Sequence, residues 1–456
     1  MLLDQDTIVA ISTPPGRGGI GIVRLSGPDA YDMAIADLRL HRELAHAQAR
    51  FAHVVDEDGQ VLDEAIVTWF QAPHSYTTED VVEIAAHGAP VLLEQIVRSA
   101  LGRGARLAEP GEFTQRAYLS GRLDLTQAEA VHDLIAAQTL QQAKTAAAQL
   151  GGSIARVIQP VKDQLIALIA ALEAGVDFVE DDLDLLPEVE ITRKIAQVMD
   201  ALNPLASSFS YGRILREGAR LAIVGQPNAG KSSLFNQLLG RDRAIVTAQP
   251  GTTRDPVSEC FSLNGIPLEL VDTAGLREVA ALPENEAERE GILRSRHNMA
   301  EADLVLHVVV ASQLAPDGEL SPEDQETQRS LAGRPALLIL SKCDLADPAL
   351  QAAPGSIRTS AATGEGIADL KQTITRVLGV QPEADLAVVT NLRQSQALDG
   401  TLKSLHKAHR AAQDATPHEF LLMDLHTALE SMDTLTGTTT PEDILQLIFS
   451  SFCIGK

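Results

Sequence analysis

Cysteine is scarce in this sequence, whose 456 residues include only Cys260, Cys343 and Cys453. The three are far apart and have neither the spacing of a metal-binding motif nor that of a disulfide framework. The sequence therefore excludes a cysteine-based zinc module and a small secreted fold held by disulfides. This cysteine usage suits a reducing cytosol.

Basic residues are few relative to acidic ones. The sequence has 37 Lys and Arg against 62 Asp and Glu, which gives a formal net charge of −25. This balance excludes a broad basic surface that grips a polynucleotide unaided. Any RNA would need a partner protein or a small local patch.

Long apolar runs are also missing. No run approaches the length needed to span a membrane, and Met1–Asp4 does not begin a secretory signal. We expect a cytoplasmic protein without membrane association. Because 45% of the residues are apolar, the chain can form substantial cores, and its length suggests about three domains.

A phosphate-binding loop is the strongest positive feature. The run Gly225–Ser233 (GQPNAGKSS) follows the apolar stretch Leu221–Val224 and precedes a helical pattern. Glycines let backbone N–H groups surround phosphate oxygens, Lys231 neutralises the β- and γ-phosphates, and the Ser232 hydroxyl can ligate Mg²⁺. The nucleotide-binding residues predicted here are Asn228, Ala229, Gly230, Lys231, Ser232 and Ser233.

Two motifs follow at the positions of nucleotide-sensing loops. Asp272 begins DTAG at the end of an apolar strand, where it would hold Mg²⁺ through water, and the Gly275 N–H would meet the γ-phosphate. The run GTTRD, residues 251–255, carries two threonines, of which we assign Thr253 to Mg²⁺ in a loop that the triphosphate orders. The GTP-binding residues predicted here are Thr252, Thr253, Asp272, Thr273, Ala274 and Gly275.

Two further motifs select the base. Asp344 ends SKCD after an apolar run, and its carboxylate can accept both N1–H and the 2-amino group of guanine, a donor pair that adenine lacks. Lys342, Ser360 and Ala361 complete the expected guanine site. Five motifs in this order predict a GTP hydrolase with a Ras-like, doubly wound G domain.

Two positions depart from the common GTPase plan. Leu276 stands where many signalling GTPases carry the glutamine that orients the attacking water, so catalysis must be organised otherwise. Ser341 stands where the guanine motif usually has asparagine. Because a hydroxyl has one donor and a shorter reach than an amide, we expect an underconnected guanine loop.

Hydrophobic patterning predicts a G domain inserted into a helical domain. Residues 1–118 mix short β runs with one amphipathic helix, which indicates an α+β domain. Helical periodicity fills 119–216, with a capping box from Thr126 to Glu129, and it resumes in 380–456. The G domain occupies 217–379. Helices on both sides of it would let the nucleotide state move helices.

Two patterns have competing interpretations. The run Gly16–Gly21 matches GxGxxG, but β-like residues follow it, so we favour a glycine-rich turn over a dinucleotide fingerprint. Cys453 fits a prenylation box badly. It is either a buried small hydrophobe or a reactive, substrate-facing thiol, and we include it among the catalytic candidates.

Several runs together point to a known family. They are Thr13–Gly21, Pro110–Thr114 with Leu123–Leu125, GTTRD at 251–255, DTAGLR at 272–277 and Phe452–Lys456 (FCIGK). On these runs the chain resembles, from end to end, the MnmE (TrmE) family of tRNA uridine-modification GTPases.

The resemblance implies a homodimer joined through its N-terminal domains. With the flavoprotein MnmG, in a heterotetramer, it would install a (carboxymethyl)aminomethyl group at C5 of wobble uridine 34 in certain tRNAs, which would bind mainly through the complex. The one-carbon unit would come from 5-formyl- or 5,10-methylene-tetrahydrofolate. By motif position, Arg24, Glu83, Arg122 and Lys456 would face the folate, whereas the residues alone also allow an exposed strand face for Arg24 and Glu83.

The resemblance also implies how hydrolysis proceeds. A K⁺ ion held by Asn228, Thr247, Gln249 and Thr252 would replace an arginine finger, and Glu288 would orient the attacking water. The alternative is a ribosome-assembly GTPase switch. Such proteins usually carry a basic RNA-binding appendage, and this acidic chain has no KH pattern.

Overall fold

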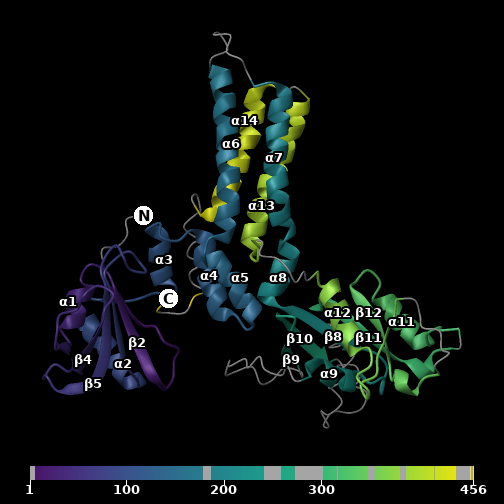
Figure 1. Ribbon diagram of the computed structural model, residues 1–456, viewed down its shortest axis with the longest axis horizontal. Helices are drawn as coiled ribbons and strands as arrows, with labels where there is room; N and C mark the ends of the chain where they lie inside the picture. The colour runs from purple at the N-terminus through teal and green to yellow at the C-terminus, as the bar shows by residue number, and fades with distance from the viewer. Residues whose placement is uncertain are drawn as a thin grey trace, which may run out of the picture. The chain divides into compact units, whose positions relative to one another are not determined.

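The computed structural model describes residues 6–177, 186–240, 258–272, 301–315, 317–347, 355–379, 387–414, 416–437, 452 and 455. The chain forms two compact units, labelled by element in Figure 1. Unit 1 comprises Met1–His132, Gln149–Val198 and Gly400–Lys456, and unit 2 comprises Asp133–Ala148 and Met199–Asp399. Within the described ranges, no helix is long and apolar enough to cross a membrane.

The first part of unit 1 is a seven-stranded sheet with the order β3-β4-β5-β6-β2-β1-β7. Neighbouring strands are antiparallel except β1 and β7. The predicted α+β fold is confirmed, and the short strands β3, β4 and β7 are additions to it. The elements are β1 (Ile8–Ile11), β2 (Gly18–Ser26), α1 (Ala30–Ile35), β3 (Leu38–Leu40), β4 (Ala49–Val55), β5 (Val61–Phe70), β6 (Val81–Gly88), α2 (Pro90–Gly102), β7 (Arg106–Leu107) and α3 (Glu112–Leu119).

Helices α1 and α2 cover one face of this sheet, and the other, named the open face, is covered at β1, where Phe113 of α3 packs with Ile8 and Ala10. On β6, Val82 and Ile84 are buried in a core shared with α1 and α2, and the side chains alternate, so Glu83 and Ala85 lie on the opposite face. Arg24 on β2 is the direct cross-strand partner of Glu83. The strand register therefore brings two predicted site residues together on the open face.

A partly buried ion network fastens α3 to the sheet. Arg116, 5% exposed, donates to carboxylate oxygens of Asp6 at 2.6 Å, Glu112 at 2.9 Å and Glu79 at 3.1 Å. Arg106 donates to Glu112 at 2.6 Å and to Asp6 at 2.7 Å. Burial raises the pKa of Asp6 and Glu112, but hydrogen bonds and charge from the two arginines outweigh it and hold both pKa values below their ordinary range.

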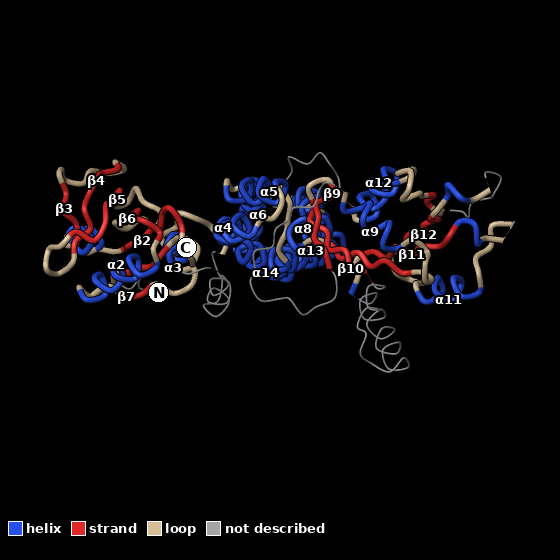
Figure 2. The backbone as a smooth tube through the Cα atoms, turned by 90° about the horizontal axis from the view of Figure 1, so that it is seen from below, coloured by secondary structure: helices blue, strands red, loops and turns tan. Residues whose placement is uncertain are grey.

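The rest of unit 1 is helical. Helix α6 buries Ile158, Leu165 and Leu172 among the residues whose three- and four-residue spacing predicts a packed helix. The parts of α7 and α13 that belong to this unit lie beside α6 and α14 as a bundle (Figures 1 and 2). The helices are α4 (Leu125–Ala136), α6 (Ser153–Asp177), α7 (Glu188–Ser207), α13 (Leu392–Gln413) and α14 (His418–Thr436).

The start of α4 differs from the prediction. The expected capping box from Thr126 to Glu129 is wrong, because the reciprocal pair lies two residues earlier. Asp124 Oδ1 accepts the N–H of Gln127 at 2.8 Å, and Gln127 Oε1 accepts the N–H of Asp124 at 3.0 Å.

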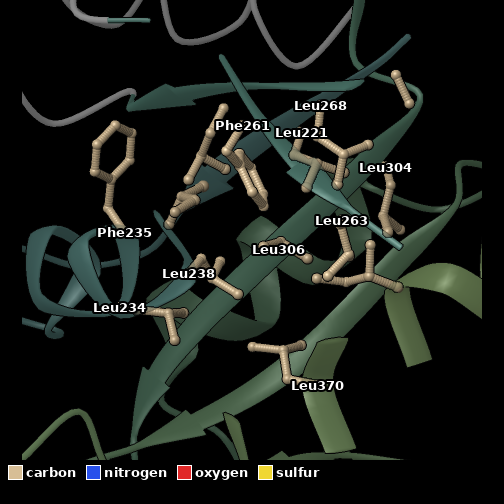
Figure 3. Packing of buried hydrophobic residues seen from close by; sticks show 14 of the residues in the cluster. Leu221, Leu234, Phe235, Leu238, Phe261, Leu263, Leu268, Leu304, Leu306 and Leu370 are labelled. Carbon is tan, nitrogen blue, oxygen red and sulfur yellow. The ribbon is translucent and has the colours of Figure 1, made fainter. Parts of the chain in front are cut away.

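Unit 2 contains a doubly wound sheet with the order β13-β12-β11-β8-β10-β9. All pairs are parallel except the edge pair β9 and β10. Helices α9 and α12 cover one face and α11 the other (Figure 2), and leucines such as Leu221 and Leu306 fill the α9 side (Figure 3). The predicted G-domain fold is confirmed. Its elements are β8 (Ala219–Val224), α9 (Lys231–Leu239), β9 (Ser258–Leu263), β10 (Ile266–Asp272), β11 (Leu304–Val310), α11 (Pro322–Ser330), β12 (Ala336–Ser341), β13 (Ile357–Arg358) and α12 (Ile367–Val377), with short 3₁₀ turns at Ala311–Gln313 and Cys343–Leu345.

Unit 2 also contains α5 (Leu140–Leu150), up to Ala148, and α8 (Phe209–Glu217). Thr139 and Gln142 form the capping box of α5. The Thr139 hydroxyl also donates at 2.5 Å to the carbonyl of Gly265, in the turn between β9 and β10, and Gln142 donates at 2.9 Å to the Arg216 carbonyl at the end of α8. One helix terminus thus holds both the hairpin turn and the segment that leads into β8.

Candidate functional site

The phosphate-binding loop lies at the carboxyl end of β8, between β11 and β10, where ligands bind in doubly wound sheets. Gly225 and Gly230 have φ angles of 149° and 89°. A Cβ on Gly225 would lie 2.1 Å from the Val308 carbonyl oxygen, so the loop passes β11 only because this residue is glycine. The predicted strand, loop and helix are present in that order.

Lys231 lies at the centre of this loop. Its side chain is buried, and its ammonium donates to the carbonyls of Gly225 at 2.9 Å and Gln226 at 2.8 Å. Ser232 and Ser233 are exposed in the first turn of α9. The N-terminal N–H groups of this helix and the ammonium together form a site suited to a polyphosphate.

The guanine motif is held by hydrogen bonds within its own loops. Ser360 Oγ donates to Asp344 Oδ1 at 2.6 Å, and the Thr363 N–H donates to Ser360 Oγ at 3.2 Å. The Asp344 side chain is exposed. Ser360 therefore fixes one carboxylate oxygen of Asp344 and orients the group for a base.

Ser341 is more fully connected than its residue type suggests. It is 5% exposed, and its hydroxyl lies 2.6 Å from the carbonyl oxygen of Ala229 in the phosphate loop and 3.2 Å from that of Val309. The short side chain thus reaches the phosphate loop, and the effect of Ser341 on nucleotide binding stays a prediction. The single hydroxyl proton ties the guanine motif to the phosphate loop.

Two more contacts join these loops. Lys342, with φ of 54°, donates from Nζ to the Asn228 carbonyl at 2.8 Å. Gln237 on α9 donates to the Ala361 carbonyl at 2.8 Å. The phosphate loop, the guanine motif and the second guanine loop are therefore one hydrogen-bonded assembly.

Several predicted residues lie outside the described part of the chain. Asp272 ends β10, but its side chain is not described. The assignments that remain predictions for this reason are Thr247, Gln249, Thr252, Thr253, Thr273, Ala274, Gly275, Glu288, Cys453 and Lys456.

A second cluster of predicted residues forms on the open face of the N-terminal sheet. Arg24 donates to Glu83 Oε1 from Nε at 2.9 Å and from Nη2 at 2.7 Å, and both side chains are partly exposed. The carbonyl of Gly455 accepts from Arg24 Nη1 at 3.2 Å and from the Ser12 hydroxyl at 3.1 Å. The chain's penultimate residue therefore belongs to this cluster.

Aromatic residues border the same cluster. The Arg24 guanidinium carbon lies 5.5 Å from the Phe113 ring centre, and that of Arg122 lies 5.5 Å from the Tyr76 ring centre. Burial raises the pKa of the Tyr76 phenol despite the hydrogen bond to Thr114 and the charges of Arg24 and Arg122. Phe113 is fully buried, so of these two rings only the half-buried Tyr76 reaches the surface of this polar site.

Tyr76 was not among the residues predicted for this site, and Phe113 was predicted only as part of a family run. Phe113 could have been found because it lies inside the run Pro110–Thr114. Tyr76 stands in no motif. Among the described residues, no group of three or more His, Cys, Asp or Glu side chains could hold a metal ion.

Comparisons with known proteins cover both sites. The model of the MnmE helical domain matches residues 125–453, and that of the GTP-binding protein TrmE N-terminus matches residues 7–122. A "tRNA modification GTPase MnmE" of Koribacter versatilis is 53% identical over 459 residues, covering 99% of each chain. One of Aquifex aeolicus is 40% identical over 457 residues, covering 99% of this chain and 100% of the relative. A solved structure of Aquifex aeolicus Era bound to GDP.AlF4⁻ is 25% identical and covers 41% of this chain and 66% of that chain, with a TM-score of 0.28.

Proposed function

The chain belongs to the MnmE (TrmE) family of tRNA modification GTPases, and we propose that it is the K⁺-activated member of a two-protein enzyme. With the flavoprotein MnmG it installs a (carboxymethyl)aminomethyl group at C5 of wobble uridine 34, using a tetrahydrofolate one-carbon unit. GTP hydrolysis in tRNA modification is the family activity, which leaves no support for the ribosome-assembly alternative.

The observation that carries the proposal is the arrangement of Arg24, Glu83 and Gly455. Arg24 binds the Glu83 carboxylate and the Gly455 carbonyl at once, so Gly455 lies at the pair that family resemblance assigns to folate. A guanidinium suits the carboxylates of a folate tail, a carboxylate suits the donors of a pterin, and the half-buried Tyr76 ring suits a flat ring. The bound folate would supply the one-carbon unit.

Hydrolysis rests on the phosphate loop. Lys231 neutralises phosphate charge, and Ser232 with Thr253 supplies hydroxyl oxygens of the kind Mg²⁺ prefers. The exposed Asn228 side chain makes no hydrogen bond among the described residues, so its amide oxygen is available to K⁺ beside Thr247, Gln249 and Thr252. Bound K⁺ would supply positive charge where the β- and γ-phosphates separate.

Glu288 is proposed to orient the attacking water, since the chain has Leu276 in place of the usual glutamine. Cys453, two residues before Gly455 in sequence, is proposed as a substrate-facing thiol. Both assignments derive from family resemblance and position in the sequence.

The open sheet face supports a homodimer joined through N-terminal domains. Phe51 on β4 and Ile66 on β5 are cross-strand partners and are 42% and 45% exposed. Apolar residues on an uncovered sheet face favour burial against another surface. Domain boundaries at 118, 216 and 379 are part of the same proposal.

The test is mass spectrometry of wobble-uridine nucleosides from cells that lack this protein. Wild-type chain should restore the modified nucleoside. Arg24→Gln should fail to restore it while keeping GTPase activity, because Arg24 lies in unit 1 and the phosphate loop in unit 2. Arg98→Gln, which alters an exposed arginine on α2, is the control. Full modification with Arg24→Gln would refute the assigned one-carbon site.

A further inference from the structure

Helix α13 carries a stripe of basic side chains. Lys403, His406, Lys407 and Arg410 are spaced by three and four residues, which places them on one helix face. All four are exposed, whereas Leu405, between them, is buried in the bundle. We name these four residues the basic stripe.

No acidic residue lies within the stripe in this strongly acidic protein. The 14 residues from Gly400 to Gln413 contain no Asp or Glu, and Asp399 and Asp414 flank them, four residues from Lys403 and from Arg410. Within the described parts of the chain, no carboxylate lies within ion-pair distance of Lys403, Lys407 or Arg410. Like charges three and four residues apart destabilise a helix by about 0.2–0.5 kcal/mol per pair.

Three other basic residues of the same bundle are paired with carboxylates, whereas Arg156 on α6 bonds only to the Gly151 carbonyl among the described residues. Lys162 on α6 pairs with Asp433 on α14 at 2.5 Å. Arg193 on α7 pairs with Glu190 at 2.5 Å, and Lys194 lies 3.9 Å from the same carboxylate. Most of the unpaired positive charge described in this bundle thus lies on one face of α13, which favours an anionic partner from outside the bundle.

A groove adjoins this face. Its volume is about 420 Å³, within the range of about 300–1,000 Å³ for small-ligand sites. Its polar groups include Thr192, His409 and Gln413, which can hydrogen-bond to sugars and base edges, and the imidazole can also stack on a base. The groove is lined by Glu188, Val189, Thr192, Arg193, Ala196, His409, Ala412 and Gln413.

We infer that the basic stripe binds the phosphate backbone of tRNA and that the groove between α7 and α13 receives an adjoining nucleotide. This rests on the proposed function, which supplies tRNA as the substrate class. The seven residue-to-residue steps from Lys403 to Arg410 rise about 10 Å along the helix, so the stripe follows a short backbone segment and not the whole RNA. The stripe fits the small local patch that RNA binding by such an acidic chain would need.

A membrane surface fits the stripe less well. Helices that lie on a membrane expose an apolar face beside the basic one. The apolar residues of α13 in this unit, such as Leu405 and Ala408, are buried in the protein core. The stripe therefore provides positive charge but no apolar face that could insert into a membrane.

The test measures tRNA binding by the full-length protein. The variant Lys403→Gln/Lys407→Gln/Arg410→Gln removes three charges at exposed positions, and Lys403→Arg/Lys407→Arg keeps them. A control, Arg39→Gln/Arg98→Gln/Arg376→Gln, removes three exposed charges elsewhere. A fluorescent tRNA transcript is titrated by anisotropy from about 50 to 200 mM KCl.

Three phosphate contacts contribute a slope of about −2 to −3 in log K against log salt. This slope corresponds to a loss of about 20- to 40-fold in tRNA affinity between the lowest and the highest salt concentration. The triple-glutamine variant should lose that part of the slope and bind more weakly at low salt. The arginine variant and the control should match wild type. Equal slope and affinity for the triple-glutamine variant and wild type would overturn the inference, as would equal losses in the control.

Two further readouts separate the alternatives. The first is binding to vesicles that contain about a third phosphatidylserine. If the stripe variant loses this binding but keeps tRNA binding, the stripe binds membranes and not tRNA. If wild-type chain restores wobble-uridine modification but the stripe variant keeps full tRNA affinity, this inference alone fails. If wild-type chain restores no modification, the proposed function fails.

Discussion

Removing the Ser341 hydroxyl should loosen nucleotide binding. In Ser341→Ala, the guanine motif loses its hydrogen bond to the Ala229 carbonyl at 2.6 Å and its contact with that of Val309 at 3.2 Å. One proton serves both acceptors, so the loss is that of one buried hydrogen bond, about 1 kcal/mol. Since about 1.4 kcal/mol is tenfold in an equilibrium constant, the Kd for GDP should rise about fivefold.

The assay is stopped-flow release of a fluorescent GDP analogue. The increase should be in the dissociation rate, because the bond orders loops that the nucleotide already occupies. Ser330→Ala is the matched control, since its exposed hydroxyl on α11 bonds only to the carbonyl of Thr327 among the described residues. Ser341→Asn should not tighten binding, because the site is buried and lies against Gly230.

A dissociation rate in Ser341→Ala within about twofold of wild type would refute this prediction. Such a change corresponds to less than half of the free energy of one hydrogen bond. An equal increase in Ser330→Ala would show a general loss of stability. Tighter binding by Ser341→Asn would support the idea of an underconnected guanine loop.

Asp344→Asn should weaken GTP and improve xanthosine triphosphate, whose 2-position offers an acceptor, and unchanged base preference in competition binding would reject the guanine assignment. GTP turnover should require K⁺, so equal rates in K⁺ and Na⁺ buffers would contradict the cation site at Asn228. Glu288→Ala should lower turnover by roughly 10² with GTP affinity nearly intact, and near-normal turnover would remove its water-positioning role. The lowered pKa values of Asp6 and Glu112 contribute stability that is present above their unfolded values and lost as pH falls through the folded ones. Denaturant unfolding should therefore show constant stability of the N-terminal sheet near neutral pH and a decline below about pH 4, and a flat profile there would contradict it.

Much of the GTP site could be predicted from the sequence because its chemistry is local. The phosphate loop needs glycine, lysine and serine at fixed spacing, and these stand within nine residues. Ser341 could not be judged in this way, since its partner Ala229 is 112 residues away and the usual asparagine rule ignores that carbonyl. A tertiary contact decides which group this side chain reaches, and residue type alone does not show it.

In the N-terminal sheet, too, the longer local patterns could be predicted and the features set by tertiary contacts could not. The runs that became β2 and β6 were clear, but β3 and β7 have three and two residues, too few for a periodic pattern. The capping box of α4 was misplaced because Asp124 and Thr126 are both good caps, and only geometry decides between them. Tyr76 joins the second site through folding alone.

The grip of Thr139 on the Gly265 carbonyl has a mechanical consequence. The turn it holds joins β9, which follows GTTRD in sequence, to β10, which ends at Asp272. A hydrogen bond of 2.5 Å fails once the atoms separate by about 1 Å more. Any displacement of this hairpin during the GTPase cycle must therefore either break that bond or move α5 as a rigid body. The two loops expected to sense the γ-phosphate are thus connected to a helix outside the G-domain sheet. A movement of the hairpin reaches α5 while the hydrogen bond of Thr139 holds, and it does not reach α5 once that bond breaks.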